Sequence, residues 1–183
     1  MILNLGSGVK NRLSHPGLIN LDIYPHENTD VAGDAHNLPF IDGCMHGVWL
    51  CAVMEHLSRP FDVADEVYRI LKPGGFVLVT TPFIQPRHGS PHDYFRYTLE
   101  GLRSVFKGFQ EVEGGATGTG PMGTWVEITV ALIGSFSRNP YISYALRFVT
   151  GWAIYPLTFV DRLIANRLFD SPVIGGVCYL GRK

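Results

Sequence analysis

The first feature of this chain that could do chemistry is a glycine-rich turn directly after a short apolar run. Residues 2–5 form the run, and Gly6, Ser7 and Gly8 follow it. Glycine adopts turn conformations that other residues avoid, and its missing side chain lets a ligand approach the backbone. A strand that enters such a loop is typical of nucleotide-binding sites, although a plain tight turn has the same sequence. The turn needs support from other residues before it predicts a ligand.

Two aspartates follow the turn at places where an adenosine would need them. Asp22 ends a second apolar run, and a carboxylate at such a strand end can accept both ribose hydroxyls. Asp34 lies with Ala35 in a later loop, where it could accept a hydrogen bond from the adenine amino group. Either aspartate could instead initiate a turn, but their order favours an adenosine ligand. A dinucleotide is disfavoured because Asn11 stands where that motif has its third glycine.

Glu55 and His56 form the first of two polar segments that could supply acid–base groups. They follow a third apolar run, residues 48–53, at the expected carboxyl edge of a parallel sheet, where such folds bind ligands. His56 is therefore a candidate for contact with a cofactor or a substrate. Alternatively, Glu55 begins a helix near its positive dipole end and His56 packs beside it.

The second polar segment, residues 85–97, combines hydrogen-bonding side chains with aromatic rings. Such a loop suits a polar acceptor such as a sugar, and His92 and Tyr94 are its candidate catalytic residues. Alternatively the loop is structural, with Asp93 capping a turn and Arg96 pairing with it. A closed zinc site is awkward, because Cys51 is expected inside a strand, and we expect no metal.

Composition narrows the class of protein. The chain has 183 residues, enough for one domain with a core, and 46% hydrophobic against 17% charged residues is a globular balance. The net charge is -1 without a basic stripe, so nucleic acid is not an expected partner. Three widely spaced cysteines indicate a reducing compartment, and the N-terminus lacks a signal-peptide pattern. We expect a cytoplasmic protein.

These side chains need a scaffold in which strands alternate with helices. Strands are expected at residues 2–5, 18–23, 48–53, 76–80, 109–114 and 173–180, with 48–53 buried on both faces. Helices are expected at residues 62–71, stopped by Lys72-Pro73-Gly74-Gly75, and after a capping Thr98. The alternation predicts an α/β fold with a doubly wound, mostly parallel sheet.

A long helical insert, residues 117–172, separates the last two expected strands. It opens with a glycine-rich hinge at residues 114–123. Its uncharged run, residues 148–160, is too short to cross a membrane. The insert could be a helical cap packed on the sheet, a lid and acceptor-site wall, a homodimer surface or a face resting on a membrane. An apolar face at helical spacing runs through Trp152, Phe159, Val160, Leu163, Ile164 and Leu168.

Four ordered stretches carry a resemblance to a known family, and residues 71–75 extend it. They are residues 3–8 (LNLGSG), 19–23 (INLDI), 33–40 (GDAHNLPF) and 53–57 (VMEHL). With them the chain resembles a small class I, Rossmann-like S-adenosylmethionine-dependent methyltransferase of the type 11 group. The likeness covers roughly residues 2–112 and the last strand. It implies a three-layer α/β/α sandwich in a single domain, with core residues 1–116 and 173–183.

The resemblance also implies which residues hold S-adenosylmethionine. Gly6, Ser7 and Gly8 would wrap its methionine end, Asp22 would hold the ribose, Ile23 would pack on the adenine, Asp34 and Ala35 would read the adenine edge, and Cys51, Ala52 and Val53 would line the sulfonium. Asn4 stands where the family often has an acidic residue, and its amide can still accept a hydrogen bond. With asparagine in place of the acidic residue, we expect S-adenosylmethionine to bind more weakly.

Two functions therefore remain open. The first is methyl transfer to a small-molecule or glycan-type acceptor, with His56, His92 and Tyr94 as candidate catalytic residues. The second is a non-catalytic binding module that keeps the cofactor fold and acts through its helical insert.

Overall fold

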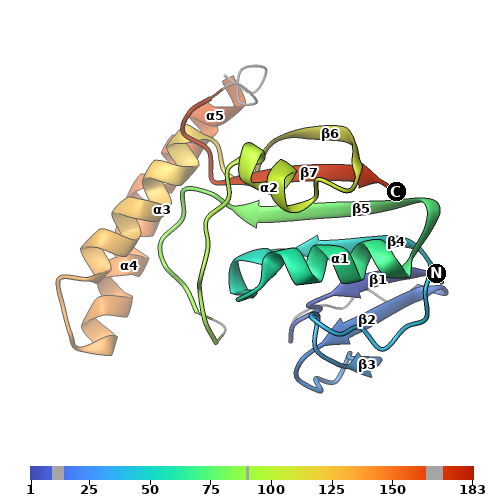
Figure 1. The fold of residues 1–183 in the computed structure, drawn as a ribbon. Coiled ribbons are helices and arrows are strands. Elements are labelled where there is room, and N and C mark those ends of the chain that lie inside the picture. The colour runs from blue at the N-terminus through green and yellow to red at the C-terminus, as the bar shows by residue number, and fades with distance from the viewer. Residues whose placement is uncertain (10–14, 90, 164–170) are drawn as a thin grey trace. The chain divides into compact units, whose positions relative to one another are not determined.

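The strands of the protein form one seven-stranded sheet in the order β3-β2-β1-β4-β5-β7-β6 (Figure 1). The computed structural model describes residues 1–9, 15–89, 91–163 and 171–183. The strands are β1 (Ile2–Leu5), β2 (Leu18–Asp22), β3 (Val31–Ala32), β4 (Met45–Cys51), β5 (Leu71–Pro82), β6 (Gln110–Thr117) and β7 (Gly176–Arg182). β1 to β5 pair in parallel, and β7 runs opposite to β5 in Figure 1. The mostly parallel α/β fold is confirmed.

The core lies against one face of the central strands. Val48 and Leu50 of β4 and Val77 and Val79 of β5 are all at most 2% exposed, while Leu78 between the last two is 39% exposed. Burial thus alternates with the two-residue period of a strand. The expectation of a strand at 48–53 buried on both faces is wrong, because alternate side chains of β4 reach the surface and the strand ends at Cys51.

Helix α1 (Pro60–Ile70) covers the buried face of the central strands. Proline suits its first turn, and Val63, Val67 and Ile70 are fully buried at helical spacing. Helix α2 (Leu99–Val105) begins after Thr98, whose hydroxyl accepts a 3.0 Å hydrogen bond from the Gly101 amide. In Figure 1 both helices lie on the same side of the sheet. The two helices expected from the sequence are confirmed.

Two glycine-rich segments expected as turns also take part in strand pairing. Helix α1 ends before residue 72 as expected, and Gly74 has a left-handed φ of 78°. The segment 72–75 belongs to β5, because the Gly74 amide donates to the Lys183 carbonyl (2.8 Å) and the Lys183 amide donates to the Gly75 carbonyl (2.9 Å). The expected hinge at 114–123 is also wrong in extent, since β6 continues to Thr117 and a helix begins at Pro121. In both places pairing with a distant strand extends into the glycine-rich segment.

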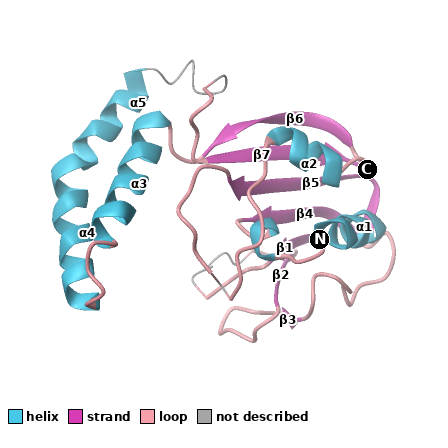
Figure 2. Cartoon of the chain, turned by 60° about the vertical axis from the view of Figure 1, so that its left-hand side comes forward, coloured by secondary structure: helices cyan, strands magenta, loops and turns pink. Residues whose placement is uncertain are grey.

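The chain divides into two compact units. Unit 1 comprises residues 1–81, 89–114 and 178–183, and unit 2 comprises residues 82–88 and 115–177. The helices of unit 2, cyan in Figure 2, are α3 (Pro121–Gly134), α4 (Pro140–Ile154), a short 3-10 helix η2 (Tyr155–Thr158) and α5 (Phe159–Leu163). The expected helical character of the insert is confirmed for these residues. Ile164 and Leu168 of its expected apolar face, and Asn11, lie outside the described residues.

Within unit 2 the helices are joined by side-chain to backbone hydrogen bonds. Asp161 of α5 accepts from the amides of Met122 (2.9 Å) and Gly123 (2.8 Å), and so caps the N-terminus of α3. Ser143 of α4 donates to the carbonyl of Gly134 in α3 (2.7 Å). In the part of the chain that the structure describes, no helix has the length and apolar character needed to cross a membrane.

Candidate functional site

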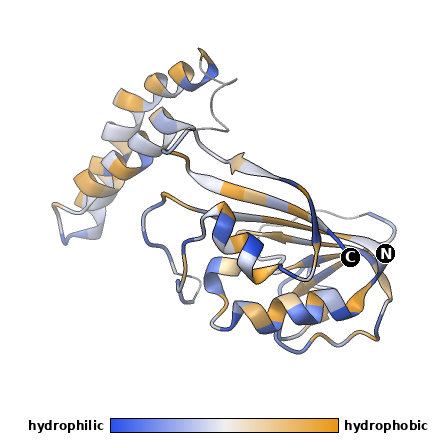
Figure 3. Cartoon of the chain, turned by 45° about the horizontal axis from the view of Figure 1, so that its top comes forward, coloured by the Kyte–Doolittle hydropathy of each residue, from blue (hydrophilic) through white to orange (hydrophobic). Residues whose placement is uncertain are grey.

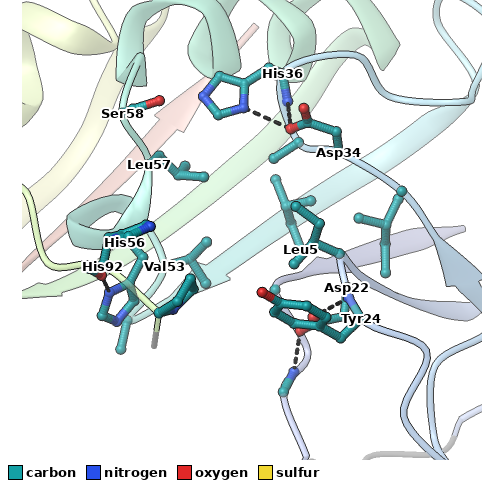
Figure 4. A pocket seen from close by; sticks show the side chains of 18 of the residues that line it. Leu5, Asp22, Tyr24, Asp34, His36, Val53, His56, Leu57, Ser58 and His92 are labelled. Carbon is teal, nitrogen blue, oxygen red and sulfur yellow. Dashed lines mark hydrogen bonds and ion pairs between the residues drawn. The ribbon is translucent and has the colours of Figure 1, made fainter. Parts of the chain in front are cut away.

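The strand order places a ligand crevice beside β1. The chain runs from β1 to β2 and β3 on one side and then crosses to β4 on the other side of β1. Ligands of open α/β sheets bind at such a reversal, outside the carboxyl ends of the strands. A cavity of about 460 Å³ lies there in unit 1, lined by residues that follow β1, β2 and β4 (Figure 4). Its volume is within the range of small-molecule sites, roughly 300–1,000 Å³.

Two glycines shape the wall that follows β1. Gly6 and Gly8 have φ angles of 70° and 65°, in the left-handed region that favours glycine. A Cβ at Gly6 would lie 2.4 Å from Cγ2 of Val53, so the end of β4 packs directly on this residue. A Cβ at Gly8 would meet no heavy atom of the described residues within 4 Å. Gly6 therefore serves packing, and Gly8 presents bare backbone to the cavity.

Asp22 connects the glycine turn to the end of β2. Its two carboxylate oxygens accept hydrogen bonds from the amides of Gly8 (2.8 Å) and Tyr24 (3.0 Å), and the residue is only 8% exposed. Asp22 therefore has the structural role in a turn that the sequence left open as an alternative. Each carboxylate oxygen has a second lone pair, so Asp22 can still accept hydroxyl groups from a ligand in the cavity.

Asp34 and His36 form a pair on another wall of the cavity (Figure 4). One oxygen of Asp34 accepts from the His36 amide (2.9 Å) and lies 2.7 Å from His36 Nδ1. The hydrogen bonds from His36, the backbone one first, lower the pKa of Asp34. A carboxylate only accepts, so Nδ1 carries the proton of this hydrogen bond. Nε2 is buried and has no hydrogen-bond partner among the described residues.

His56 faces the cavity from the short 3-10 helix η1 (Met54–His56) that follows β4. Its Nδ1 is hydrogen-bonded to the backbone carbonyl of His92, and a carbonyl can only accept, so Nδ1 carries the proton. Its Nε2 lies 3.7 Å from Oε1 of Glu55, which is fully buried. Thr81 donates a 3.3 Å hydrogen bond to the other carboxylate oxygen of Glu55. Glu55 thus lies in the first turn of η1, as the structural alternative expected, and is also a buried neighbour of His56.

The polar loop of residues 85–97 is tied to η1 through its backbone. The Tyr94 amide donates to the Glu55 carbonyl (2.8 Å), and the rings of Tyr94 and His92 lie 5.5 Å apart at the cavity. Arg96 donates to both oxygens of Asp93, as the structural alternative for this loop expected. That ion pair raises the pKa of Arg96. The loop therefore contains a structural ion pair, Asp93 with Arg96, and two residues that line the cavity, His92 and Tyr94.

The structure brings most of the predicted site residues to this one cavity. Those that line it are Gly6, Gly8, Asp22, Ile23, Asp34, Ala35, Ala52, Val53, His56, His92 and Tyr94. Whether they bind a cofactor or act in catalysis stays a prediction.

Three predicted residues lie outside the lining. The Asn4 amide donates to Asn20 Oδ1 (2.8 Å) across the β1–β2 pair, so its side chain holds the two strands together. Cys51 is exposed at the end of β4. Ser7 is 7% exposed, and its hydroxyl has no hydrogen-bond partner among the described residues.

Two features of the site had no sequence prediction. His36 lies in residues 33–40, which carry the family resemblance, but it was not expected to face the site. Its position two residues after Asp34 could have suggested that the two side chains pair. Ala52 has a φ of 53°, which costs a non-glycine residue about 1–2 kcal/mol. Its amide donates to the Thr80 carbonyl (2.8 Å), which holds this turn at the cavity floor.

A second cavity, in unit 2, has a different chemistry. Its volume is about 470 Å³, and Gln85 is its one lining residue with a hydrogen-bonding side chain. The other residues along it are Phe83, Ile84, Pro86, Ile128, Ala131 and Leu132. It lacks the polar groups that a nucleoside needs, so the unit 1 cavity is the candidate site.

Comparison with known proteins identifies a family model that matches part of the chain. Residues 10–79 match the family model described as a methyltransferase domain, of type 11. These residues include β2, β4, α1 and much of the cavity wall. A search of the curated proteins gave no match.

Solved structures share the fold at low sequence identity. A SAM-dependent methyltransferase from Archaeoglobus fulgidus has 16% identity and a TM-score of 0.58, covering 100% of this chain and 85% of that one. Phosphoethanolamine N-methyltransferase 2 of Haemonchus contortus, solved with S-adenosyl-L-methionine, has 17% identity and a TM-score of 0.60, covering 100% and 48%. The (4+2)-cyclase SpnF has 17% identity and a TM-score of 0.57, covering 100% and 73%. The chain therefore has the Rossmann-like α/β fold of these methyltransferase structures, and residues 10–79 match the type 11 methyltransferase domain.

Proposed function

We propose that this methyltransferase binds S-adenosylmethionine in the unit 1 cavity and transfers its methyl group to a small-molecule or glycan-type acceptor. The observation that carries the proposal is the convergence of Gly8, Asp22 and Asp34 on one cavity at the reversal of strand order. The family match and a structural neighbour solved with this cofactor support it.

The residues present fit the cofactor. Asp22 keeps lone pairs for the two ribose hydroxyls, and Gly8 leaves open space beside its backbone. At the adenine end, the exposed carboxylate of Asp34 lines the cavity and can only accept hydrogen bonds, which suits an amino group. Ile23 and Val53 supply apolar contacts. When bound, the cofactor supplies an electrophilic methyl group.

The chain's own residues can then position the acceptor and take its proton. Methyl transfer to a hydroxyl or a protonated nitrogen releases one proton, and His56 Nε2 is the candidate acceptor of that proton. The His92 carbonyl fixes the tautomer that leaves Nε2 basic. The buried Glu55 carboxylate, 3.7 Å away, would stabilise the imidazolium that forms. Tyr94, 49% exposed at the cavity, is placed to contact the acceptor.

A non-catalytic binding module is the second candidate. One observation favours it: the helices of unit 2 expose many large apolar side chains, as expected of a protein that acts through a docking surface. The two functions differ in turnover, because a binding module would hold the cofactor without producing S-adenosylhomocysteine.

Calorimetry with S-adenosylmethionine and S-adenosylhomocysteine tests the site first. Asp22→Ala should abolish binding, while Asp65→Ala, an exposed carboxylate on α1, should leave it unchanged. Circular dichroism confirms that both variants are folded. Unchanged binding by Asp22→Ala would remove the cofactor from this cavity. Release of S-adenosylhomocysteine with a panel of hydroxyl, amine and sugar acceptors then separates the enzyme from the binding module.

We also propose a cytoplasmic location. None of the three cysteines forms a disulfide in the structure, which suits a reducing compartment. Fractionation of cells that express the tagged chain tests this directly.

A further inference from the structure

Helix α4 exposes a continuous row of aromatic side chains. None of its 15 residues is buried. Tyr141, Tyr144, Phe148, Trp152 and the following Tyr155 are 84%, 71%, 56%, 72% and 62% exposed. At about 3.6 residues per turn they fall within about a quarter of the helix circumference. We call these five residues the aromatic face.

The side of α4 that packs on α3 does not include the aromatic face. Ser143 donates to the Gly134 carbonyl, and a Cβ at Gly151 would lie 3.9 Å from Val130. At about 100° per residue, Ser143 stands roughly 140° around the helix from Phe148, whereas Gly151, which has no side chain, stands beside the edge of the aromatic face. In a water-soluble protein the apolar side of a helix normally packs inward. Here the larger apolar groups point away from the neighbouring helix.

Neighbouring rings of the aromatic face contact one another. The Tyr144 and Phe148 rings are stacked with centroids 6.5 Å apart, and Phe148 and Trp152 are 6.2 Å apart. The helices of unit 2 accordingly show extended orange stretches in Figure 3. Exposed apolar surface of this extent is unfavourable in water, so a partner that covers it would be stabilising.

The charges around the aromatic face have one sign. Residues 128–160 contain Arg138 and Arg147 and no aspartate or glutamate. The next acidic residue, Asp161, is engaged at the N-terminus of α3. Arg162 lies over the ring of Phe159, with its guanidinium carbon 4.8 Å from the ring centroid. A partner surface should therefore be both apolar and anionic.

We propose that the aromatic face of α4 docks on the surface of an anionic lipid bilayer. Tyrosine and tryptophan, four of its five residues, have an apolar ring and a polar tip, and this combination is typical of the membrane–water interface. Arginines beside them can pair with lipid phosphates. The helix is about 22 Å long at 1.5 Å per residue, shorter than a bilayer core of about 30 Å, so it would lie along the surface.

A second copy of the chain fits this surface less well. A two-fold interface places the same patch against itself. The arginines of one copy would then meet those of the other, with no carboxylate in residues 128–160 to pair with them. Lipid phosphates supply the missing negative charge.

Vesicle flotation with the full-length chain tests the proposal. The vesicles are phosphatidylcholine alone, or the same lipid with about 30 mol% phosphatidylglycerol, which raises the negative surface potential. We expect binding to the anionic vesicles that weakens as salt is added. Phe148→Ser with Trp152→Ser should reduce the bound fraction by about tenfold or more, because two interfacial rings are lost.

Matched controls make the outcome specific. Ile41→Ser with Phe61→Ser replaces two apolar residues of unit 1 that are 79% and 52% exposed, and it should bind vesicles like the wild type. Circular dichroism and thermal unfolding verify that both double variants fold. Failure of the wild type to bind anionic vesicles would overturn the proposal. So would equal binding by the α4 variant, or a stable dimer in ultracentrifugation that the α4 substitutions dissociate.

Discussion

Alanine at Gly8 and at Gly6 should have different consequences, although both residues have a positive φ. Gly8→Ala places a methyl group where no described heavy atom lies within 4 Å, so its cost to stability is the backbone term, about 1–2 kcal/mol. Gly6→Ala adds a clash with Val53 at 2.4 Å. Overpacking of that kind costs about 1–3 kcal/mol more, which gives about 2–5 kcal/mol in total.

Thermal unfolding and calorimetry together measure the difference. For a chain of this size, each kcal/mol lowers Tm by about 2–4 °C, so Gly6→Ala should unfold clearly below Gly8→Ala. Gly8→Ala should instead lower the affinity for S-adenosylmethionine by about tenfold or more, since the new methyl group would occupy space beside the ligand.

Gly43 offers a matched control. Its φ is 61°, a Cβ there would also meet no described atom within 4 Å, and it does not line the cavity. Gly43→Ala should therefore lose as much stability as Gly8→Ala and keep its affinity for the cofactor. The reasoning is refuted if Gly8→Ala binds normally, or if Gly43→Ala loses affinity to the same degree.

Three further predictions concern named hydrogen bonds. Asp22→Asn should lower the free energy of unfolding by about 1–3 kcal/mol, because its NH2 group would face the amide of Gly8 or Tyr24; urea titration measures this. His56→Gln should lower kcat by about 100-fold or more with KM for the cofactor unchanged, because the candidate proton acceptor is lost; steady-state kinetics measure both constants. Glu66, whose pKa is lowered by its hydrogen bond from Arg69, stabilises the fold above its ordinary pKa of 4.5, and this contribution is lost as the pH falls through the lower native pKa. Urea titrations from pH 6 to pH 3 should show a shallower loss of stability in Glu66→Gln than in the wild type.

The sequence predicts best what depends on neighbouring residues. The glycine turn, the end of β2 at Asp22 and the cap at Thr98 are local signals, and the structure has all three elements. The cavity itself could be expected because the order of strands and helices is enough to suggest a parallel sheet, whose carboxyl edge collects the loops.

What the sequence did not predict depends on pairings between distant residues. Asn4 faces Asn20 because β1 and β2 pair in that register, and a single strand carries no information about its partner. The extension of β5 through Gly74 depends in the same way on Lys183. Nothing local distinguishes these positions from a ligand-facing amide or a simple turn.

The apolar face of the insert shows a further limit. Helical periodicity identifies residues that share a side of a helix, but it does not say whether that side packs inward. The described residues of the expected face, from Trp152 to Leu163, are exposed, and the exposed apolar surface also extends back to Tyr141, which was not expected. The side of α4 that faces α3 includes Ser143, whose hydroxyl donates to the carbonyl of Gly134 in α3.

Asp22 shows why a structural role and a binding role need not exclude one another. The carboxylate that would receive the ribose also holds the amide of Gly8, so the turn and the ligand site share one group. Ligand binding should therefore stabilise the fold and the turn together. At a cofactor concentration 100 times Kd, the native state should gain about 2.7 kcal/mol, and amide exchange at residues 6–8 should slow in parallel. A gain in Tm without slower exchange at these residues would separate the ligand from the glycine turn and place it elsewhere on the molecule.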